Sequence, residues 1–147
     1  MATKDGKGFT LANLVAVVFI VGSEAIVVLP RINDLIKNHR LDNAAQEVWQ
    51  DMHRARLLAI KEKGTILVKF DHDSYRAVRA ATGEVAFRRN LSEDYTDVII
   101  STTAVRGRIS FDRTGTAEGN TTEIEIEGPT GTRRFTILAT GKIGGLP

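Results

Sequence analysis

The pattern of apolar and polar residues divides the chain into three stretches. From Phe9 to Pro30 the sequence is almost entirely apolar, and Glu24 is its only ionisable residue. From Arg31 to about Lys63, apolar residues recur every three or four positions, which is the period of an amphipathic helix. From Thr65 onward they alternate with polar residues, which is the period of half-buried β-strands. The pattern predicts an α+β fold, with a long helix followed by an antiparallel sheet or small sandwich.

The apolar stretch is long enough to cross a membrane. Its 22 residues would form a helix of roughly 33 Å, close to the thickness of the hydrocarbon layer. Lys4 and Lys7 precede it and favour a cytoplasmic amino terminus, so the rest of the chain would be exported. A secretory signal peptide is the alternative, but no small-residue cleavage site precedes Pro30. We therefore predict a single-pass membrane segment at 9–30 and an exported domain at 31–147.

Pro30 need not end the helix, because neighbours or water can satisfy the carbonyl group that a proline leaves free. We expect one long bent helix from Phe9 to about Lys63, whose second half packs on the sheet. Five alternating runs predict strands, and Gly128-Pro-Thr-Gly131 is the clearest turn between two of them. The sequence leaves open whether the strands form one sheet or two. The runs are Ile66–Phe70, Val85–Phe87, Ile109–Phe111, Ile124–Ile126 and Phe135–Ile137.

Composition narrows the function classes. Residues 31–147 carry 18 Lys and Arg against 16 Asp and Glu, which argues against a domain built mainly to neutralise nucleic-acid phosphates. The chain has no cysteine, so disulfides, thiolate metal sites and cysteine nucleophiles are excluded.

Few residues have the arrangement that catalysis or metal binding requires. Asp71-His72-Asp73 offers ligand types, but adjacent residues point in different directions and rarely converge on one ion. Gly141–Gly145 is rich in glycine, yet no helix follows it to form a phosphate loop. No serine has the surroundings of a nucleophile elbow. We predict no catalytic residue, metal or cofactor, and hence no enzyme.

The junction Lys7-Gly8-Phe9-Thr10-Leu11 resembles the class III signal sequence of type IV pilins and type II secretion pseudopilins. If Phe9 is the first mature residue, Gly22 is the fourteenth and Pro30 the twenty-second, where this family typically carries a glycine and a proline. The resemblance implies that residues 1–8 are a leader, that a prepilin peptidase cuts between Gly8 and Phe9, and that Phe9 is N-methylated. It also implies that the apolar helix forms the core of a fibre.

One position departs from the family. Its fifth mature residue is usually Glu, which is thought to neutralise the amino terminus of a neighbouring subunit, whereas this chain has Asn13. An amide cannot cancel a charge, so the resemblance implies weaker docking onto an assembled subunit and a position at the fibre tip. Glu24 lies roughly 16 Å further along a helix. It is either a protonated or snorkelled carboxyl near the outer leaflet, or the mark of a locally unwound stretch beside Gly22. The expected assembly residues are Phe9, Asn13, Gly22, Glu24 and Pro30.

Three later segments resemble the minor pseudopilins of the GspH/FimT family. Ala55-Arg56 with Ala59-Ile60, Ile109–Ala117 and Phe135–Ile143 are similar to that group's segments. The resemblance implies a structural subunit of a type II secretion pseudopilus in the bacterial inner membrane and periplasm. Its partners would be other pseudopilin or pilin subunits, the prepilin peptidase and the inner-membrane assembly platform. Two alternatives remain: a minor pilin of a type IV pilus, and a signal-anchored periplasmic binding domain that does not polymerise.

Paired arginines raise the hypothesis of nucleic-acid contact, because some FimT-like pilins are associated with DNA uptake. Arg88-Arg89, Arg106-x-Arg108 and Arg133-Arg134 could align across strands into a basic strip, joined by Lys142. However, the Gly-Arg-x-Arg motif of those relatives is replaced here by Gly141-Lys-Ile-Gly144. We favour the alternative that each pair straddles a strand, with one arginine beside Glu123, Glu125 or Glu127.

Overall fold

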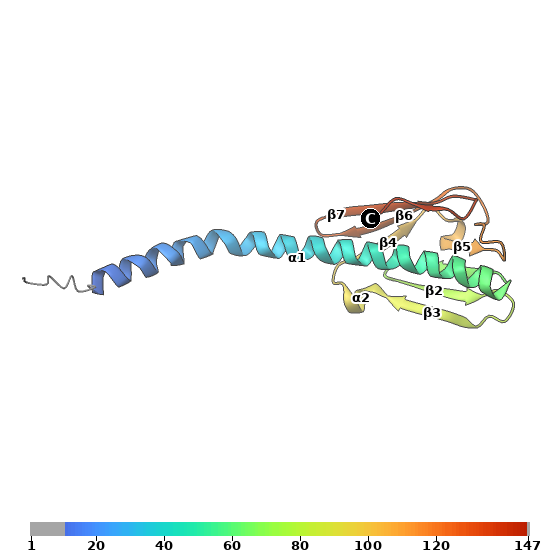
Figure 1. Cartoon of the computed structure of the whole chain (residues 1–147), viewed down its shortest axis with the longest axis horizontal. Helices are drawn as coiled ribbons and strands as arrows, with labels where there is room; N and C mark the ends of the chain where they lie inside the picture. The colour runs from blue at the N-terminus through green and yellow to red at the C-terminus, as the bar shows by residue number, and fades with distance from the viewer. Residues whose placement is uncertain (1–10, 147) are drawn as a thin grey trace, which may run out of the picture. The chain divides into compact units, whose positions relative to one another are not determined.

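The computed structural model describes residues 11–146, and within the helix it describes the side chains outside residues 21–31 (Figure 1). The chain divides into two compact units, one ending at Ile36 and the other beginning at Lys37. Helix α1, Leu11–Glu62, contributes to both. Within the described residues, no stretch of helix has both the length and the apolar character needed to span a bilayer.

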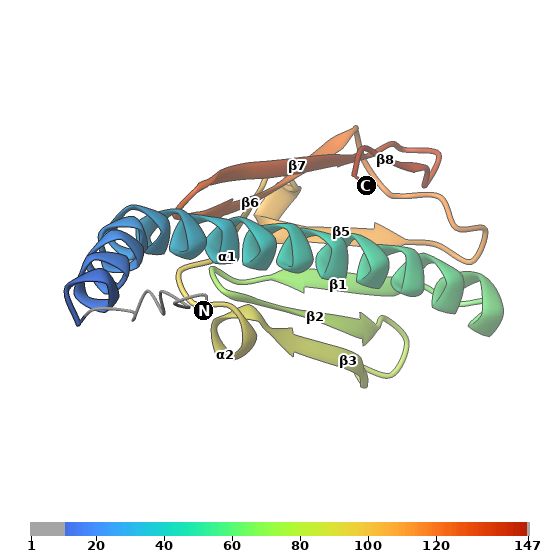
Figure 2. The same cartoon turned by 60° about the vertical axis from the view of Figure 1, so that its left-hand side comes forward.

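The second unit contains two antiparallel sheets, so the strands form two sheets and not one. The first has the order β3-β2-β1-β5, and the second has the order β4-β6-β7-β8. Residues 37–62 of α1 lie along both sheets (Figure 2). The elements are β1 Ile66–Phe70, β2 Ser74–Arg79, β3 Val85–Asn90, α2 Leu91–Asp94, β4 Ile99–Thr102, the 3₁₀ turn η1 Val105–Gly107, β5 Arg108–Phe111, β6 Thr122–Gly128, β7 Gly131–Ile137 and β8 Ile143–Gly144.

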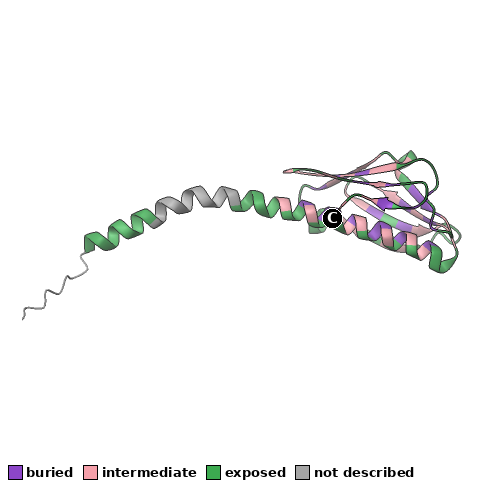
Figure 3. Cartoon of the chain, turned by 45° about the horizontal axis from the view of Figure 1, so that its top comes forward, coloured by how far each residue is buried: buried purple, intermediate pink, exposed green. Residues whose placement is uncertain are grey.

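One face of α1 forms the centre of the core. Its residues recur at three- and four-residue steps, as the sequence pattern predicts, and seven of them have no exposed surface (Figure 3). Four of the seven are alanines, whose small side chains allow the helix backbone to approach the strands closely. The seven are Leu41, Ala44, Ala45, Val48, Met52, Ala55 and Ala59.

The end of α1 is fixed by backbone geometry. The Gly64 N–H donates to the Ala59 carbonyl over 3.1 Å, and the Lys63 N–H donates to the Ile60 carbonyl over 3.3 Å. This pair of bonds is a Schellman cap. Lys63 occupies its left-handed position with φ 51°, and β1 begins at Ile66.

All five predicted strands are present, and the structure adds three. The β6–β7 hairpin turns at Pro129-Thr130, where Gly128 pairs with Gly131. A Cβ atom on Gly128 would lie 3.1 Å from Leu41 Cδ1 of the helix. Strands β2, β4 and β8 were not predicted: β2 mixes Tyr75 and Ala77 with arginines, and β4 and β8 are short.

A buried polar network ties α1 to the first sheet. The Tyr75 hydroxyl donates to Asp51 Oδ2 over 2.7 Å, and both residues are at least 94% buried, with exposed fractions of 1% and 6%. Arg89 Nε lies 2.8 Å from Glu47 Oε1 and 3.6 Å from Asp51 Oδ2. Burial, followed by the charge of Asp51 and the hydrogen bond to it, raises the pKa of Tyr75 well above its usual range. Tyr75 is therefore held as a protonated donor to a buried carboxylate.

We expect Tyr75→Phe to lower the free energy of unfolding by about 1–3 kcal/mol, because a buried carboxylate loses a hydrogen-bond donor. Denaturant unfolding of the full-length protein, followed by fluorescence of its only tryptophan, Trp49, measures this loss. In an Asp51→Ala background the same change should cost clearly less. Equal costs in the two backgrounds would show that the hydroxyl does not stabilise Asp51.

Candidate functional site

Three segments that are distant in sequence meet at one point, and one of the three is the last part of α1. Arg56 Nε of α1 donates to the Gly115 carbonyl over 3.0 Å. A Cβ atom on Gly115 would lie 2.6 Å from Ile60 Cδ1, and one on Gly141 would overlap the Gly115 carbonyl group. Both glycines have positive φ angles, 80° and 77°, which L side chains rarely adopt. The three segments are those on which the GspH/FimT resemblance rests.

The turn that presents the Gly115 carbonyl is organised by Asp112. The Asp112 carboxylate accepts bonds from the Thr114 N–H at 2.8 Å, the Thr114 hydroxyl at 2.7 Å and the Thr116 N–H at 3.0 Å. These bonds, led by the one from the Thr114 hydroxyl, lower the pKa of Asp112 to about 2. The Ala117 N–H donates to the Ala139 carbonyl over 3.0 Å. The turn is therefore joined both to α1 and to the loop that follows β7.

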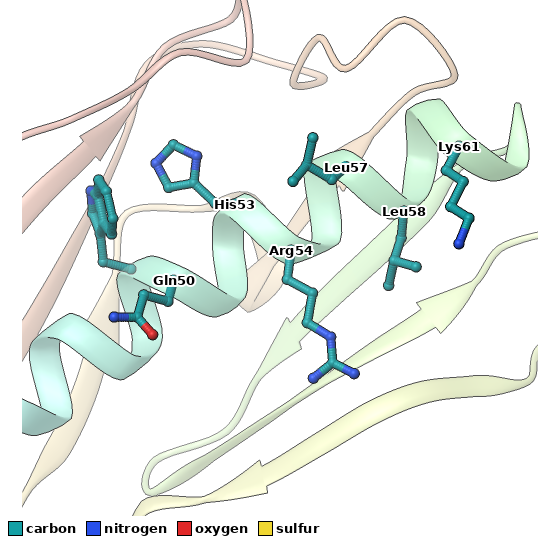
Figure 4. A pocket seen from close by; sticks show the side chains of 7 residues that line it. Gln50, His53, Arg54, Leu57, Leu58 and Lys61 are labelled. Carbon is teal, nitrogen blue, oxygen red and sulfur yellow. The ribbon is translucent and has the colours of Figure 1, made fainter.

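The outer surface of α1 bears a shallow hollow of about 320 Å³ (Figure 4). Trp49 and His53 pack edge to face, with ring centroids 4.2 Å apart. Burial, and then the charge of Arg56, lower the pKa of His53. Leu57 is 64% exposed. All the residues that line the hollow belong to one helix, so no second element brings groups together over a substrate: they are Trp49, Gln50, His53, Arg54, Leu57, Leu58 and Lys61.

Metal binding finds no support in the part of the chain that the structure describes. No group of three or more His, Asp or Glu side chains there is placed to hold an ion. Asp71, His72 and Asp73 lie in the turn between β1 and β2, and β1 and β2 pair directly on either side of it.

The predicted processing and assembly residues are only partly covered by the structure. Gly8 and Phe9 lie outside the described residues. Asn13 lies on α1 and is exposed. Gly22, Glu24 and Pro30 belong to the helical backbone of α1, and their side chains lie outside the description.

The structure does not bring all the paired arginines into one strip. Arg88 and Arg89 of β3 and Arg108 of β5 belong to the first sheet, whereas Arg133 and Arg134 of β7 belong to the second. Lys142 is exposed after β7.

Two of the three arginine pairs straddle their strands, whereas Arg106 lies in η1 and Arg108 begins β5. Arg133 Nε lies 2.6 Å from Asp42 Oδ1 of the helix. Arg134 Nε lies 2.8 Å from Glu125 Oε1 on the neighbouring strand. Arg89 reaches Glu47 of the helix, while Arg88 is exposed. The favoured alternative therefore describes the β7 pair correctly, and the β3 pair also straddles its strand, although its partner is on the helix.

Comparison with known proteins identifies the fold and a family. Residues 44–141 match the family described as Type II transport protein GspH. This range contains Arg56, Gly115 and Gly141, so the point where the three segments meet lies within the matched region. No curated protein matches the chain by sequence.

Two kinds of solved structure share the fold. The type IV minor pilin FimU of Pseudomonas aeruginosa is 17% identical, with a TM-score of 0.64 over 77% of this chain and 92% of that chain. A second crystal form of FimU gives a TM-score of 0.58. The minor pseudopilin EpsH from the type 2 secretion system of Vibrio cholerae is 14% identical, with a TM-score of 0.57 over 70% of this chain and 93% of that chain.

We expect Gly141→Ala to lower the free energy of unfolding by at least about 3 kcal/mol, because the added methyl group meets backbone atoms that cannot move aside cheaply. Gly83→Ala is the matched control, since Gly83 has φ 73° but open space around its Cβ position. It should cost only about 1–2 kcal/mol, for the left-handed backbone alone. Denaturant unfolding of the two variants measures the difference. If both variants lose the same free energy of unfolding, the added methyl group at Gly141 has no steric effect.

Proposed function

The chain belongs to the GspH family of type II transport proteins, and on that premise we propose that it is a minor pseudopilin, a structural subunit of a type II secretion pseudopilus. Prepilin peptidase removes residues 1–8 and leaves an N-methylated Phe9. The inner-membrane assembly platform then moves the subunit from the membrane into a periplasmic fibre. The domain formed by residues 37–147 is displayed on that fibre and performs no catalysis.

The observation that carries this proposal is the apolar surface of the first turns of α1. Seven large apolar residues between positions 11 and 20 are 51–81% exposed. Such a surface is unfavourable in water and is typical of a segment that lipid or another protein covers. Phe9 and the residues up to Pro30 continue the same apolar sequence. The seven are Leu11, Leu14, Val15, Val17, Val18, Phe19 and Ile20.

In a fibre this surface would pack against the equivalent helices of sister subunits. Lipid tails are as apolar as leucine, so the exchange of lipid for protein depends on close fit and on the few polar groups present. Asn13 and Glu24 are the polar groups at issue. Asn13 cannot neutralise the amino terminus of a preceding subunit, which supports a place at the tip, where fewer neighbours are needed.

A minor pilin of a type IV pilus is the second candidate. It is favoured by the similarity in fold to the minor pilin FimU, and it uses the same processing and the same packing of helices. A single-pass binding domain that never polymerises is the third candidate, and it differs because its leader would remain.

Mass spectrometry of the protein isolated from membranes of its host tests the proposal. We expect a mature chain that lacks residues 1–8 and begins with methylated Phe9, and that sediments with a fibre. Gly8→Glu should keep the leader, because the peptidase cuts after this glycine, whereas Gly6→Glu should be processed normally. An intact leader on the wild-type chain would support the anchored domain and overturn both pilin candidates.

We expect Asn13→Glu to increase the share of the protein that sediments with fibres, because a carboxylate pairs with a buried ammonium group and an amide does not. Asn33→Glu is the matched control, since Asn33 is also exposed on α1 but lies beyond the apolar stretch. Quantitative immunoblotting of sedimented fibres measures both variants. If the Asn13→Glu variant is incorporated into fibres no better than the wild type, Asn13 is not the reason for a position at the tip.

A further inference from the structure

Four basic residues form a straight line across the first sheet. The strand register places Arg88 opposite Arg76, Arg76 opposite Lys69, and Lys69 opposite Arg108. Each of the four strands therefore contributes one cation to the line. Directly opposite residues in antiparallel strands are about 5 Å apart, so the line spans about 15 Å. We call these four residues the cation row.

The cation row lies on the face of the sheet that points away from α1. Val68, Tyr75 and Ile109, each adjacent in sequence to a member of the row, are buried in the core, and successive residues of a strand point to opposite faces. Arg89 reaches Glu47 of α1, which places Arg88 on the other face. Arg76, Arg88 and Arg108 are exposed, and Lys69 is half-buried.

The fold itself does not require the row. Like charges directly opposite one another destabilise a sheet. Among the described residues, no ion pair joins any of the four to a carboxylate. The four strands of this sheet contain six basic residues and no acidic one, whereas β6 of the other sheet carries three Glu. Positive charge is thus concentrated on one face at a cost to stability.

An apolar line runs beside the cation row on the same face. Leu67 pairs with Val78 in the register, and both are half-buried. Leu67 and Arg108 also line a shallow groove of about 370 Å³, together with Val105, which is 79% exposed, and with Ser110, Glu118 and Gly119. Apolar residues with arginines beside them are typical of a protein interface. A surface for single-stranded nucleic acid needs stacking aromatic rings, and the outward positions 67, 69, 76, 78, 88, 108 and 110 hold none.

We propose that this face of the β3-β2-β1-β5 sheet docks an acidic, partly apolar protein face of a neighbouring fibre subunit. The proposal rests on the proposed function, which supplies such neighbours. The occupant is a different subunit and not a second copy, because Glu123 and Glu125 of the acidic strand β6 are already paired with Arg134 of this chain. Arg134 lies 2.8 Å from Glu125 and 3.9 Å from Glu123. Asp71 and Asp73 lie in the β1–β2 turn, at one end of these two strands.

The test uses the full-length protein in its host, with a photo-crosslinking amino acid at position 76. We expect the crosslink to reach a peptide of another fibre subunit that carries carboxylates beside apolar residues. Arg76→Glu with Arg88→Glu should lower co-sedimentation with fibres by at least about tenfold, because opposed like charges replace attraction. Changing the partner's crosslinked carboxylates to Lys should restore it.

The matched control is Arg40→Glu with Arg113→Glu, which alters net charge equally at two exposed arginines outside the four strands of the first sheet. It should co-sediment within about twofold of the wild type. Misfolding is excluded by Trp49 fluorescence, since replacing arginine in a row of like charges should leave the unfolding midpoint unchanged or raise it.

Several outcomes would overturn the docking surface. One is equal co-sedimentation of the two double variants, and another is a crosslink to a basic segment, to a second copy or to lipid. Binding of purified protein to duplex DNA that is lost in Arg76→Glu with Arg88→Glu would assign the row to a phosphate backbone instead. Wild-type protein that keeps its leader and never sediments with a fibre overturns the proposed function. If the wild-type protein and the charge-reversed variant both sediment with the fibre to the same extent, the docking surface alone is overturned.

Discussion

The close approach of α1 to both sheets is the constraint on which the rest of the domain depends. The helix presents a face on which four of seven fully buried residues are alanine, so its backbone comes near the strands. The approach leaves no room for a side chain at Gly115, where a Cβ atom would lie 2.6 Å from Ile60 Cδ1 of the helix, and little room at Gly128, next to Leu41. Because a close-packed interior does not absorb added volume easily, these two glycines follow from the close approach of the helix.

Polar contacts fix how the helix is turned about its axis. The Tyr75 hydroxyl of β2 donates to Asp51, and Arg56 donates to the Gly115 carbonyl. Asp42 meets Arg133 from the second sheet. A rotation of the helix would break all three at once and leave a buried carboxylate without its donor. Such contacts hold residues 37–62 of α1 in one orientation against both sheets.

The charges of the domain are sorted by sheet. The strands of the first sheet carry only positive charge, while the second sheet pairs Glu125 with Arg134 internally. Internal pairing leaves the second sheet close to neutral, whereas the cation row remains open to a partner. The apolar surface of α1 and the cation row would then make contacts of different kinds. Any helix of complementary shape can cover the apolar surface, whereas the cation row selects its partner by charge.

The sequence alone determined that a long helix precedes the strands, and it determined the amphipathic face of α1 and five of the eight strands, because each of these is set by a local period of apolar residues. It also indicated the family, through Arg56, Gly115 and Gly141 in their segments. It did not predict β2, in which arginines interrupt the apolar alternation, nor the short strands β4 and β8. Only the tertiary structure decided that there are two sheets, that Arg56 and the two glycines meet at one point, and that Lys69, Arg76, Arg88 and Arg108 share one line. Strand order and register arise from contacts between residues far apart in the chain, and no local pattern records them.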